Sequence, residues 1–289
     1  LLNSVYVYSE RLKSELRLID KSQSLTDYKK TVKDWEALLD AHWFFSSEIQ
    51  KTKDTLHELV GTDLYITTSP AGLMMLDTVN GALMAINGAL HDNMDGLKLV
   101  GTDLIIGLQG NSGSSAGVQV YDTITGTFGN GRLLAGLPSN IVNNIDAANN
   151  EVYIATDGGI GRWSLQTNDW LNPLTTTDGL PSNIIQDVLV DSNNLWIATP
   201  SGVAQLDTNT GSTTTITSSN GMLGTSSWGL ISTVDSTTGS VQIHVSHDGA
   251  GRERPGVSSL DGNTGLVIQT HRFDQLPSNT VTALASDWG

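Results

Sequence analysis

The chain has 289 residues, no cysteine, and 15 Lys and Arg against 30 Asp and Glu, which gives a formal net charge of −15 at pH 7. The acidic excess lies in residues 61–289, which hold six basic and twenty acidic residues. This composition argues against nucleic acid and anionic membrane surfaces as partners. No apolar run approaches the about 18 residues that a membrane span needs, and the absence of cysteine leaves the redox compartment open.

The first 50 residues carry helical periodicity. Apolar side chains recur every three or four residues in two segments, as on the buried face of a helix. They are Leu1, Val5, Tyr8, Leu12, Leu16 and Ile19, then Leu25, Tyr28, Val32, Trp35, Leu39 and His42. We predict a helical segment over residues 1–50, arranged like a hairpin and packed against its neighbour. A short strand at Val5–Val7 is the alternative for its beginning.

From Thr55 onward the sequence repeats itself. The tetrapeptide Leu-Pro-Ser-Asn occurs at 137–140, 180–183 and 276–279, and Val152–Thr156 matches Leu195–Thr199 at an offset of 43 residues. Turns of the form Asp-x-x-x-Gly begin at Asp77, Asp122, Asp207 and Asp261. A period of about 40–45 residues that holds some four short strands is typical of β-propeller blades.

The sequence therefore predicts an all-β fold. We expect a β-propeller of about five four-stranded blades over Thr55–Phe273, with the first strand of a sixth blade from Thr280, inside a repeat region at 55–289. Because the chain begins at Leu1 without Met and ends inside this sixth blade, we expect a fragment or a ring closed by other means. Open blade edges then predict self-association.

The Leu-Pro-Ser-Asn entry, the Leu195–Thr199 type of second strand and the Asp-x-x-x-Gly turn resemble the two-component-regulator propeller repeat, over about residues 55–289. The resemblance implies an extracellular, periplasmic or cell-surface location and a sensing module without enzymatic activity, as in hybrid two-component regulators. A structural or adhesive surface propeller is one alternative. A second is an enzyme similar to streptogramin lyases, whose His/Glu and magnesium site has no clear counterpart in this sequence.

The sequence offers no assembled catalytic or metal site. It has neither a G-x-S-x-G elbow nor a phosphate-binding loop. The Asp-x-x-x-Gly turns lack the further acids and distal Glu of a calcium loop, so we expect Asp to cap its own turn and Gly to adopt the left-handed conformation. His244, His247 and His271, with Asp248 and Glu253, match no zinc spacing. We predict no catalytic residue, no metal and no cofactor.

The most distinctive loop is the insertion at 247–256, His-Asp-Gly-Ala-Gly-Arg-Glu-Arg-Pro-Gly. In a propeller the loops from strand two to strand three and from blade to blade share one face, and loops on a rigid scaffold often carry recognition. We expect this face to bind an extracellular ligand, such as a glycan, or a surface protein through Arg252 and Arg254, with Glu253 and His247. Trp228 is either an aromatic platform for that ligand or a buried blade residue. A solvated loop without a partner is the alternative for the insertion.

Overall fold

The structure, a computed structural model, describes residues 57–68, 71–108, 117–129, 132–133, 136–235, 237–247 and 256–272. The chain divides into two compact units, Leu1–Lys53 and Asp54–Gly289, and the described residues belong to the second. The expected helical segment at 1–50, the expected strand from Thr280 and the residues Arg252, Glu253 and Arg254 lie outside the described residues.

Five antiparallel sheets follow one another along the chain, and each is a blade. Blade 1 consists of β1 (His57–Val60), β2 (Asp63–Thr68), β3 (Gly72–Asp77) and β4 (Leu83–Ile86). Blade 2 consists of β5 (Met94–Val100), β6 (Asp103–Leu108), β7 (Gly117–Asp122), β8 (Thr127–Phe128) and β9 (Arg132–Leu133). Its outermost position is divided, because the short strands β8 and β9 both pair with β7.

The other three blades have four strands each, in chain order. Blade 3 consists of β10 (Val142–Ala148), β11 (Glu151–Thr156), β12 (Gly159–Ser164) and β13 (Asp169–Leu174). Blade 4 consists of β14 (Asp187–Asp191), β15 (Asn194–Thr199), β16 (Gly202–Asp207) and β17 (Thr213–Ile216). Blade 5 consists of β18 (Ser227–Val234), β19 (Val241–His247), β20 (Gly256–Asp261) and β21 (Val267–Arg272). The predicted all-β propeller fold is confirmed.

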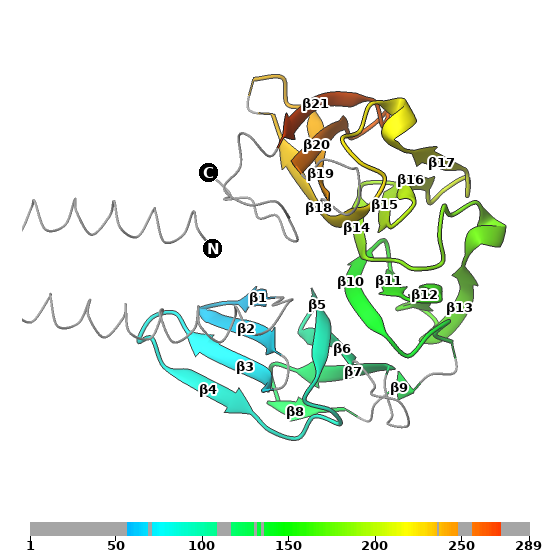
Figure 1. Cartoon of the computed structure of the whole chain (residues 1–289). Helices are drawn as coiled ribbons and strands as arrows, with labels where there is room; N and C mark the ends of the chain where they lie inside the picture. The colour runs from blue at the N-terminus through cyan, green and yellow to red at the C-terminus, as the bar shows by residue number, and fades with distance from the viewer. Residues whose placement is uncertain are drawn as a thin grey trace, which may run out of the picture. The chain divides into compact units, whose positions relative to one another are not determined.

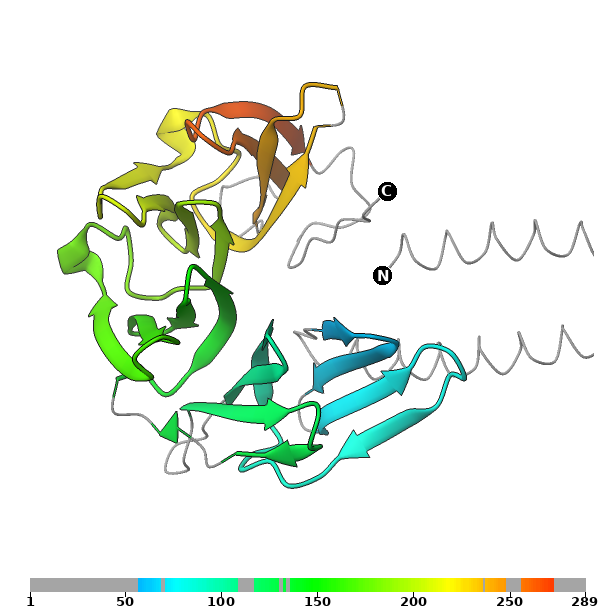
Figure 2. The ribbon, with the colours of Figure 1, turned by 180° about the vertical axis from the view of Figure 1, so that it is seen from behind.

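The blades are arranged in an arc (Figures 1 and 2). The first strand of each blade, β1, β5, β10, β14 or β18, lies nearest the centre of the arc and contacts the first strand of the next blade. Both faces of each blade that lies between two others are therefore covered by neighbours. This arrangement explains why the second strands do not alternate between apolar and polar residues.

Blade-to-blade packing supplies the core. Each of four hydrophobic clusters joins one pair of consecutive blades. In β15 the side chains of Leu195 and Ile197 join the cluster shared with blade 3, whereas Trp196 between them joins the cluster shared with blade 5. All three are fully buried. Since each buried Leu or Ile is worth roughly 1.5–3 kcal/mol, these interfaces hold the blades in register.

The repeated Asp-x-x-x-Gly segments are self-capped turns. Asp207 is typical, because its Oδ1 accepts the backbone N–H groups of Asn209 (2.8 Å) and Thr210 (3.1 Å). Gly211 ends the turn at φ 71°, in the left-handed region. The same carboxylate contacts occur at Asp77, Asp122 and Asp261, and also at Asp235. These bonds hold the pKa of Asp207 below its ordinary value. The predicted capping role is confirmed.

The Leu-Pro-Ser-Asn segment is a linker that closes onto the scaffold. Leu180 is buried in the cluster between blades 3 and 4. The Oγ of Ser182 accepts the N–H of Ile184 (3.0 Å), and the Oδ1 of Asn183 accepts the N–H of Thr176 (2.8 Å). Thr176 begins the short 3₁₀ helix η1 (Thr176–Asp178); η2 (Ser218–Asn220) precedes blade 5 in the same way. In this copy, the leucine, serine and asparagine of the motif thus contribute to folding.

Hydrogen bonds also connect the inner strands along the arc. The carboxylate of Asp187 on β14 accepts the side-chain amide of Asn144 on β10 and the backbone N–H of Leu230 on β18 (2.6 Å). Asp146 on β10 pairs with Lys98 on β5 (2.7 Å) and accepts an N–H from β14. Two buried aspartates therefore tie blades 2 to 5 together.

Candidate functional site

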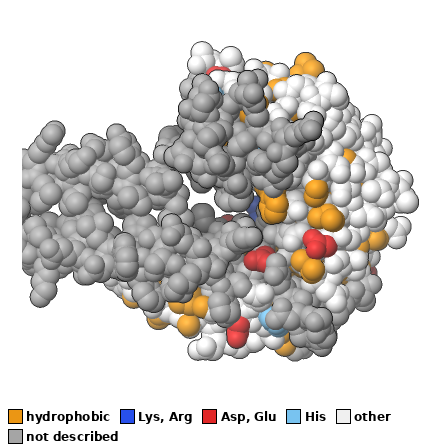
Figure 3. All heavy atoms as spheres, viewed as in Figure 1, with side chains coloured by type: hydrophobic (Ala, Val, Ile, Leu, Met, Phe, Trp, Pro, Cys, Tyr) orange, Lys and Arg blue, Asp and Glu red, His pale blue; other side chains and the backbone are white. Residues whose placement is uncertain are grey.

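One end of the described blades combines the blade-to-blade linkers with the loops from strand two to strand three. The two strands that flank the insertion meet this end, since β19 finishes at His247 and β20 starts at Gly256. Exposed apolar residues stand here among the described residues. Leu90 (53% exposed) lies in the linker before blade 2, and one more stands at the entry to each of blades 3, 4 and 5: Ile141 (38%), Ile184 (43%) and Trp228 (38%). On the face seen in Figure 3, hydrophobic side chains form separate groups among polar ones.

A β-bulge places Trp228. The pairing of β18 with β19 runs from Ser227 opposite His247 to Leu230 opposite Val245, so two residues of β18 stand against Ser246 alone. A bulge bends the strand and redirects a side chain, and the indole of Trp228 is exposed as a result. Of the two roles expected for Trp228, burial in a blade is wrong, and an exposed aromatic surface is what the structure contains.

His247 lies in the interior. Its side chain has no exposed surface; its Nδ1 is 3.2 Å from the carbonyl oxygen of Ser226 and its Nε2 is 2.9 Å from Ser258 Oγ. A ligand on the surface cannot reach this ring, so the expectation that His247 contacts a ligand is not supported in this conformation. The positions of Arg252, Glu253 and Arg254 lie outside the described residues, and their role stays a prediction.

Two Ser–His pairs occur in blade 5, and neither is an accessible nucleophile. Besides His247 with the fully buried Ser258, His244 Nδ1 is 2.8 Å from Ser259 Oγ, which is 2% exposed. Burial, and then the nearby His271, lower the pKa of His244. Among the described residues no group of three or more His, Asp or Glu side chains is arranged to hold a metal ion.

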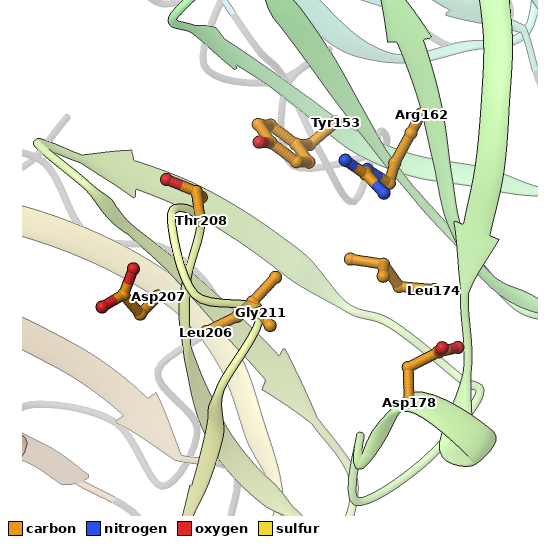
Figure 4. A pocket seen from close by; sticks show the side chains of 8 residues that line it. All are labelled: Tyr153, Arg162, Leu174, Asp178, Leu206, Asp207, Thr208 and Gly211. Atoms are coloured by element: carbon orange, nitrogen blue, oxygen red, sulfur yellow. The ribbon is translucent and has the colours of Figure 1, made fainter.

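A groove of about 260 Å³ separates the outer parts of blades 3 and 4 (Figure 4). Tyr153, Arg162 and Leu174 of blade 3 face the Thr208–Gly211 turn of blade 4, while the carboxylates of Asp178 and Asp207 point away from the space between them. Arg162 is paired with Glu151. Burial, and then the charge of Glu151, raise the pKa of Tyr153 to about 12.

The polar groups of this groove are already engaged. Asp178 accepts the N–H of Thr175 (2.9 Å), Asp207 caps its own turn, and the guanidinium of Arg162 is neutralised by Glu151. Because the two acids turn outward and the cation is paired, the groove presents no set of groups that converges on one ligand.

The repeat family described as two component regulator propeller matches residues 179–201, from the Leu-Pro-Ser-Asn linker through the first hairpin of blade 4. This segment is a two-component-regulator propeller repeat. The resemblance noted in the sequence is thus confirmed, and the other blades have the same strand order as the matched one. No curated protein matches the chain at a significant level.

Solved structures with the same fold include extracellular domains of two component systems of B. thetaiotaomicron. One is described as the extracellular domain of the hybrid two component system BT3049, with 17% identity, a TM-score of 0.55, and coverage of 75% of this chain and 30% of that chain. The corresponding domain of BT4673 shares 16% identity at a TM-score of 0.59 and covers 75% and 28%. The computationally designed protein Ika8 aligns at 16% identity and a TM-score of 0.50, covering 81% and 77%.

At identities of 16–17%, the similarity shows that this chain shares the fold of these structures, and nothing more. This chain spans less than a third of the length of these two extracellular domains. In the part of the chain that the structure describes, no helix has the length and hydropathy needed to cross a membrane.

Proposed function

We propose that this chain is a propeller module of an extracytoplasmic sensor and performs no chemistry. It binds a ligand or surface partner at the end of the blades that carries the blade-to-blade linkers. The observation that carries the proposal is the exposed Trp228, which lies in a bulge at the linker end of blade 5. An aromatic ring that is partly wet offers a large apolar contact at low entropic cost. A glycan or a protein side chain would stack on it.

Support for the location and for sensing comes from similarity alone. The solved structures described as extracellular domains of two component systems share the fold, and fold by itself does not fix activity. The absence of chemistry is proposed because the two Ser–His pairs of blade 5 are engaged within the sheet, with their serines buried. A structural or adhesive propeller with the same binding face is the alternative.

Sequence adds the insertion to the proposed site. Arg252 and Arg254 supply two of the six basic residues of the region 61–289, and a planar guanidinium binds carboxylates and sugar hydroxyls. Glu253 adds an acceptor for hydroxyl or ammonium groups. These three residues are proposed as contacts together with Trp228.

The test begins with a screen of the whole chain against a glycan array and a set of surface proteins. Trp228→Ala and the double variant Arg252→Ala/Arg254→Ala should each weaken binding to the retrieved partner and leave the circular dichroism spectrum unchanged. Ile124→Ala is the matched control, because Ile124 is 76% exposed in a turn at the opposite end of the blades. If Trp228→Ala binds as well as the parent does, the site assignment is wrong.

A further inference from the structure

Blade 5 differs from blades 3 and 4 at two consecutive positions of its second strand. In blades 3 and 4 this strand ends in Ile-Ala-Thr, at 154–156 and 197–199, whereas β19 ends in Val-Ser-His at 245–247. The registers make the positions equivalent, since Thr156, Thr199 and His247 each stand opposite the first glycine of the third strand. Ser246 therefore replaces an alanine, and His247 replaces a threonine.

The two replacements hold the inner strand on either side of Trp228. Ser246 Oγ accepts the N–H of Gly229 at 2.8 Å and lies 3.4 Å from the carbonyl oxygen of Gly229. His247 Nδ1 reaches the carbonyl oxygen of Ser226 at 3.2 Å. Ser246 and His247 have no exposed surface. The backbone of Gly229 in the bulge and the carbonyl of Ser226 just before the strand thus find side-chain partners in β19.

The contacts of His247 form one directional series. A carbonyl oxygen can only accept, so Nδ1 carries the proton, and in the neutral ring Nε2 accepts from the hydroxyl of Ser258 at 2.9 Å. Ser258 Oγ in turn accepts the N–H of Leu223 at 3.1 Å. Each donor faces an acceptor, and the series fixes the linker at Leu223 and Ser226 to β19 and β20.

In blades 3 and 4 the equivalent threonines have a local task. Thr156 Oγ1 donates to the carbonyl of Gly159 and Thr199 Oγ1 to that of Gly202, both at 2.7 Å, so that each closes the tight turn after its own strand. His247 has no such turn to close, because the 247–256 insertion follows it. Its ring reaches the linker and the inner strand instead.

We propose that Ser246 and His247 are positioning residues that fix the bulge and orient the indole of Trp228 for its partner. The role of Trp228 in binding rests on the proposed function. The orientation of its indole rests on the hydrogen bonds described above. Neither residue touches the ligand; both act through the backbone of residues 226–229.

The experiment measures Trp228 without a ligand. Iodide quenching is recorded for each variant and for the same variant with Trp228→Phe, and the difference isolates the emission of Trp228 from that of the other tryptophans. Ser246→Ala and His247→Thr, the second of which restores the residue of the repeat, should increase the quenching of Trp228. Thr199→Ala is the matched control: it removes the equivalent side-chain bond in blade 4 and should lower the melting temperature without changing Trp228.

Conservative variants separate positioning from general stability. The amide nitrogen of Asn occupies the place of Nδ1, so His247→Asn can still donate to Ser226 and should preserve the parental quenching. The side chain of Gln reaches the place of Nε2, so His247→Gln keeps Ser258 but loses Ser226 and should behave like His247→Thr. If His247→Thr does not fold, Ser246→Ala still gives the answer, because it removes a single oxygen.

Unchanged quenching of Trp228 in both Ser246→Ala and His247→Gln would overturn the inference, as would an equal change in Thr199→Ala. Binding of the screened partner is measured in parallel. Altered quenching with unaltered binding supports the positioning role and refutes the part of Trp228 in the proposed function, so the two failures are distinguishable.

Discussion

Removal of the Asp187 carboxylate should weaken the joint between three blades. Asp187→Ala leaves three donors without their acceptor: the side-chain amide of Asn144 and the backbone N–H groups of Val188 and Leu230. A buried donor left unsatisfied costs about 1–3 kcal/mol. Since Asn144 can reorient, we expect a loss of about 3–5 kcal/mol in the free energy of unfolding. For a domain of this size that corresponds to roughly 10 °C in melting temperature.

The ionisation of Asp187 adds a pH dependence whose sign follows from burial. Burial raises the pKa of Asp187 to about 7, against the opposing hydrogen bonds from Asn144, Leu230 and Val188. The folded chain then binds this proton more tightly than the unfolded chain does. The contribution to stability is present in full below the unfolded pKa near 4, declines as pH rises, and is lost above about 7. At about 1.4 kcal/mol per pH unit, the loss between pH 5 and 7 is about 2 kcal/mol.

The assay is chemical unfolding of the parent, Asp187→Ala, Asp187→Asn and the control Asp169→Ala at pH 5, 6, 7 and 8, followed by circular dichroism. Asp169 is an exposed residue of the outer strand β13, so its variant should match the parent. Asp187→Asn cannot ionise; the stability difference between parent and Asp187→Asn should therefore change by about 2 kcal/mol from pH 5 to 7. A difference that is constant over this range, or an Asp187→Ala variant as stable as Asp169→Ala, would refute the reasoning.

Three further predictions concern a close backbone approach, a buried tyrosine and the blade edges. Gly107→Ala should destabilise blade 2 by about 1–3 kcal/mol in urea unfolding, because a Cβ there would lie 2.1 Å from the carbonyl oxygen of Asp95; Gly129→Ala, where the nearest atom is 3.5 Å away, should be tolerated. In a spectrophotometric titration one tyrosine should ionise near pH 12, and Tyr153→Phe should remove that step; a single transition near pH 10 would contradict it. Light scattering should detect self-association through blade edges, and a strictly monomeric species with all edge amides protected would argue against it.

The sequence predicted the blades because their signals are local. Each strand ends at a turn that its own residues encode, such as the Asp207 carboxylate with Gly211, and every repetition of the pattern reinforces the assignment. The offset of 43 residues also has a spatial meaning that the period alone could not reveal. Asn144, Asp187 and Leu230 stand 43 residues apart and are hydrogen-bonded in series. Contacts between residues of different blades depend on how whole sheets pack, and a local sequence pattern does not predict them.

The site was harder to predict, for a related reason. Trp228 follows a degenerate linker and was compatible with burial, since one extra residue in β18 leaves no mark on a list of apolar positions. His247 was assigned to the insertion as the first residue of the charged segment 247–256. Alignment of Val245–His247 with Ile197–Thr199 would have placed it inside the strand, at the position of Thr199. The signal in the sequence was therefore the difference between this segment and its equivalents in blades 3 and 4. The chemical character of a histidine did not by itself indicate whether the side chain is buried.

Blade 5 differs from the blade before it mainly at its linker end. The linker before blade 5 carries Met222 where Leu180 stands in the preceding one, and both are buried between blades, so folding tolerates that change. Blade 4 closes and packs without a bulge, without the polar pair Ser246 and His247 and without the insertion. The bulge alone is not peculiar to blade 5, because the inner strands of blades 2 and 3 also have one. A bulge costs ladder hydrogen bonds, and a buried imidazole must find partners for both nitrogens. In blade 5 such compensation accompanies features that blade 4 does without, which agrees with the recognition role proposed for that end of the blade.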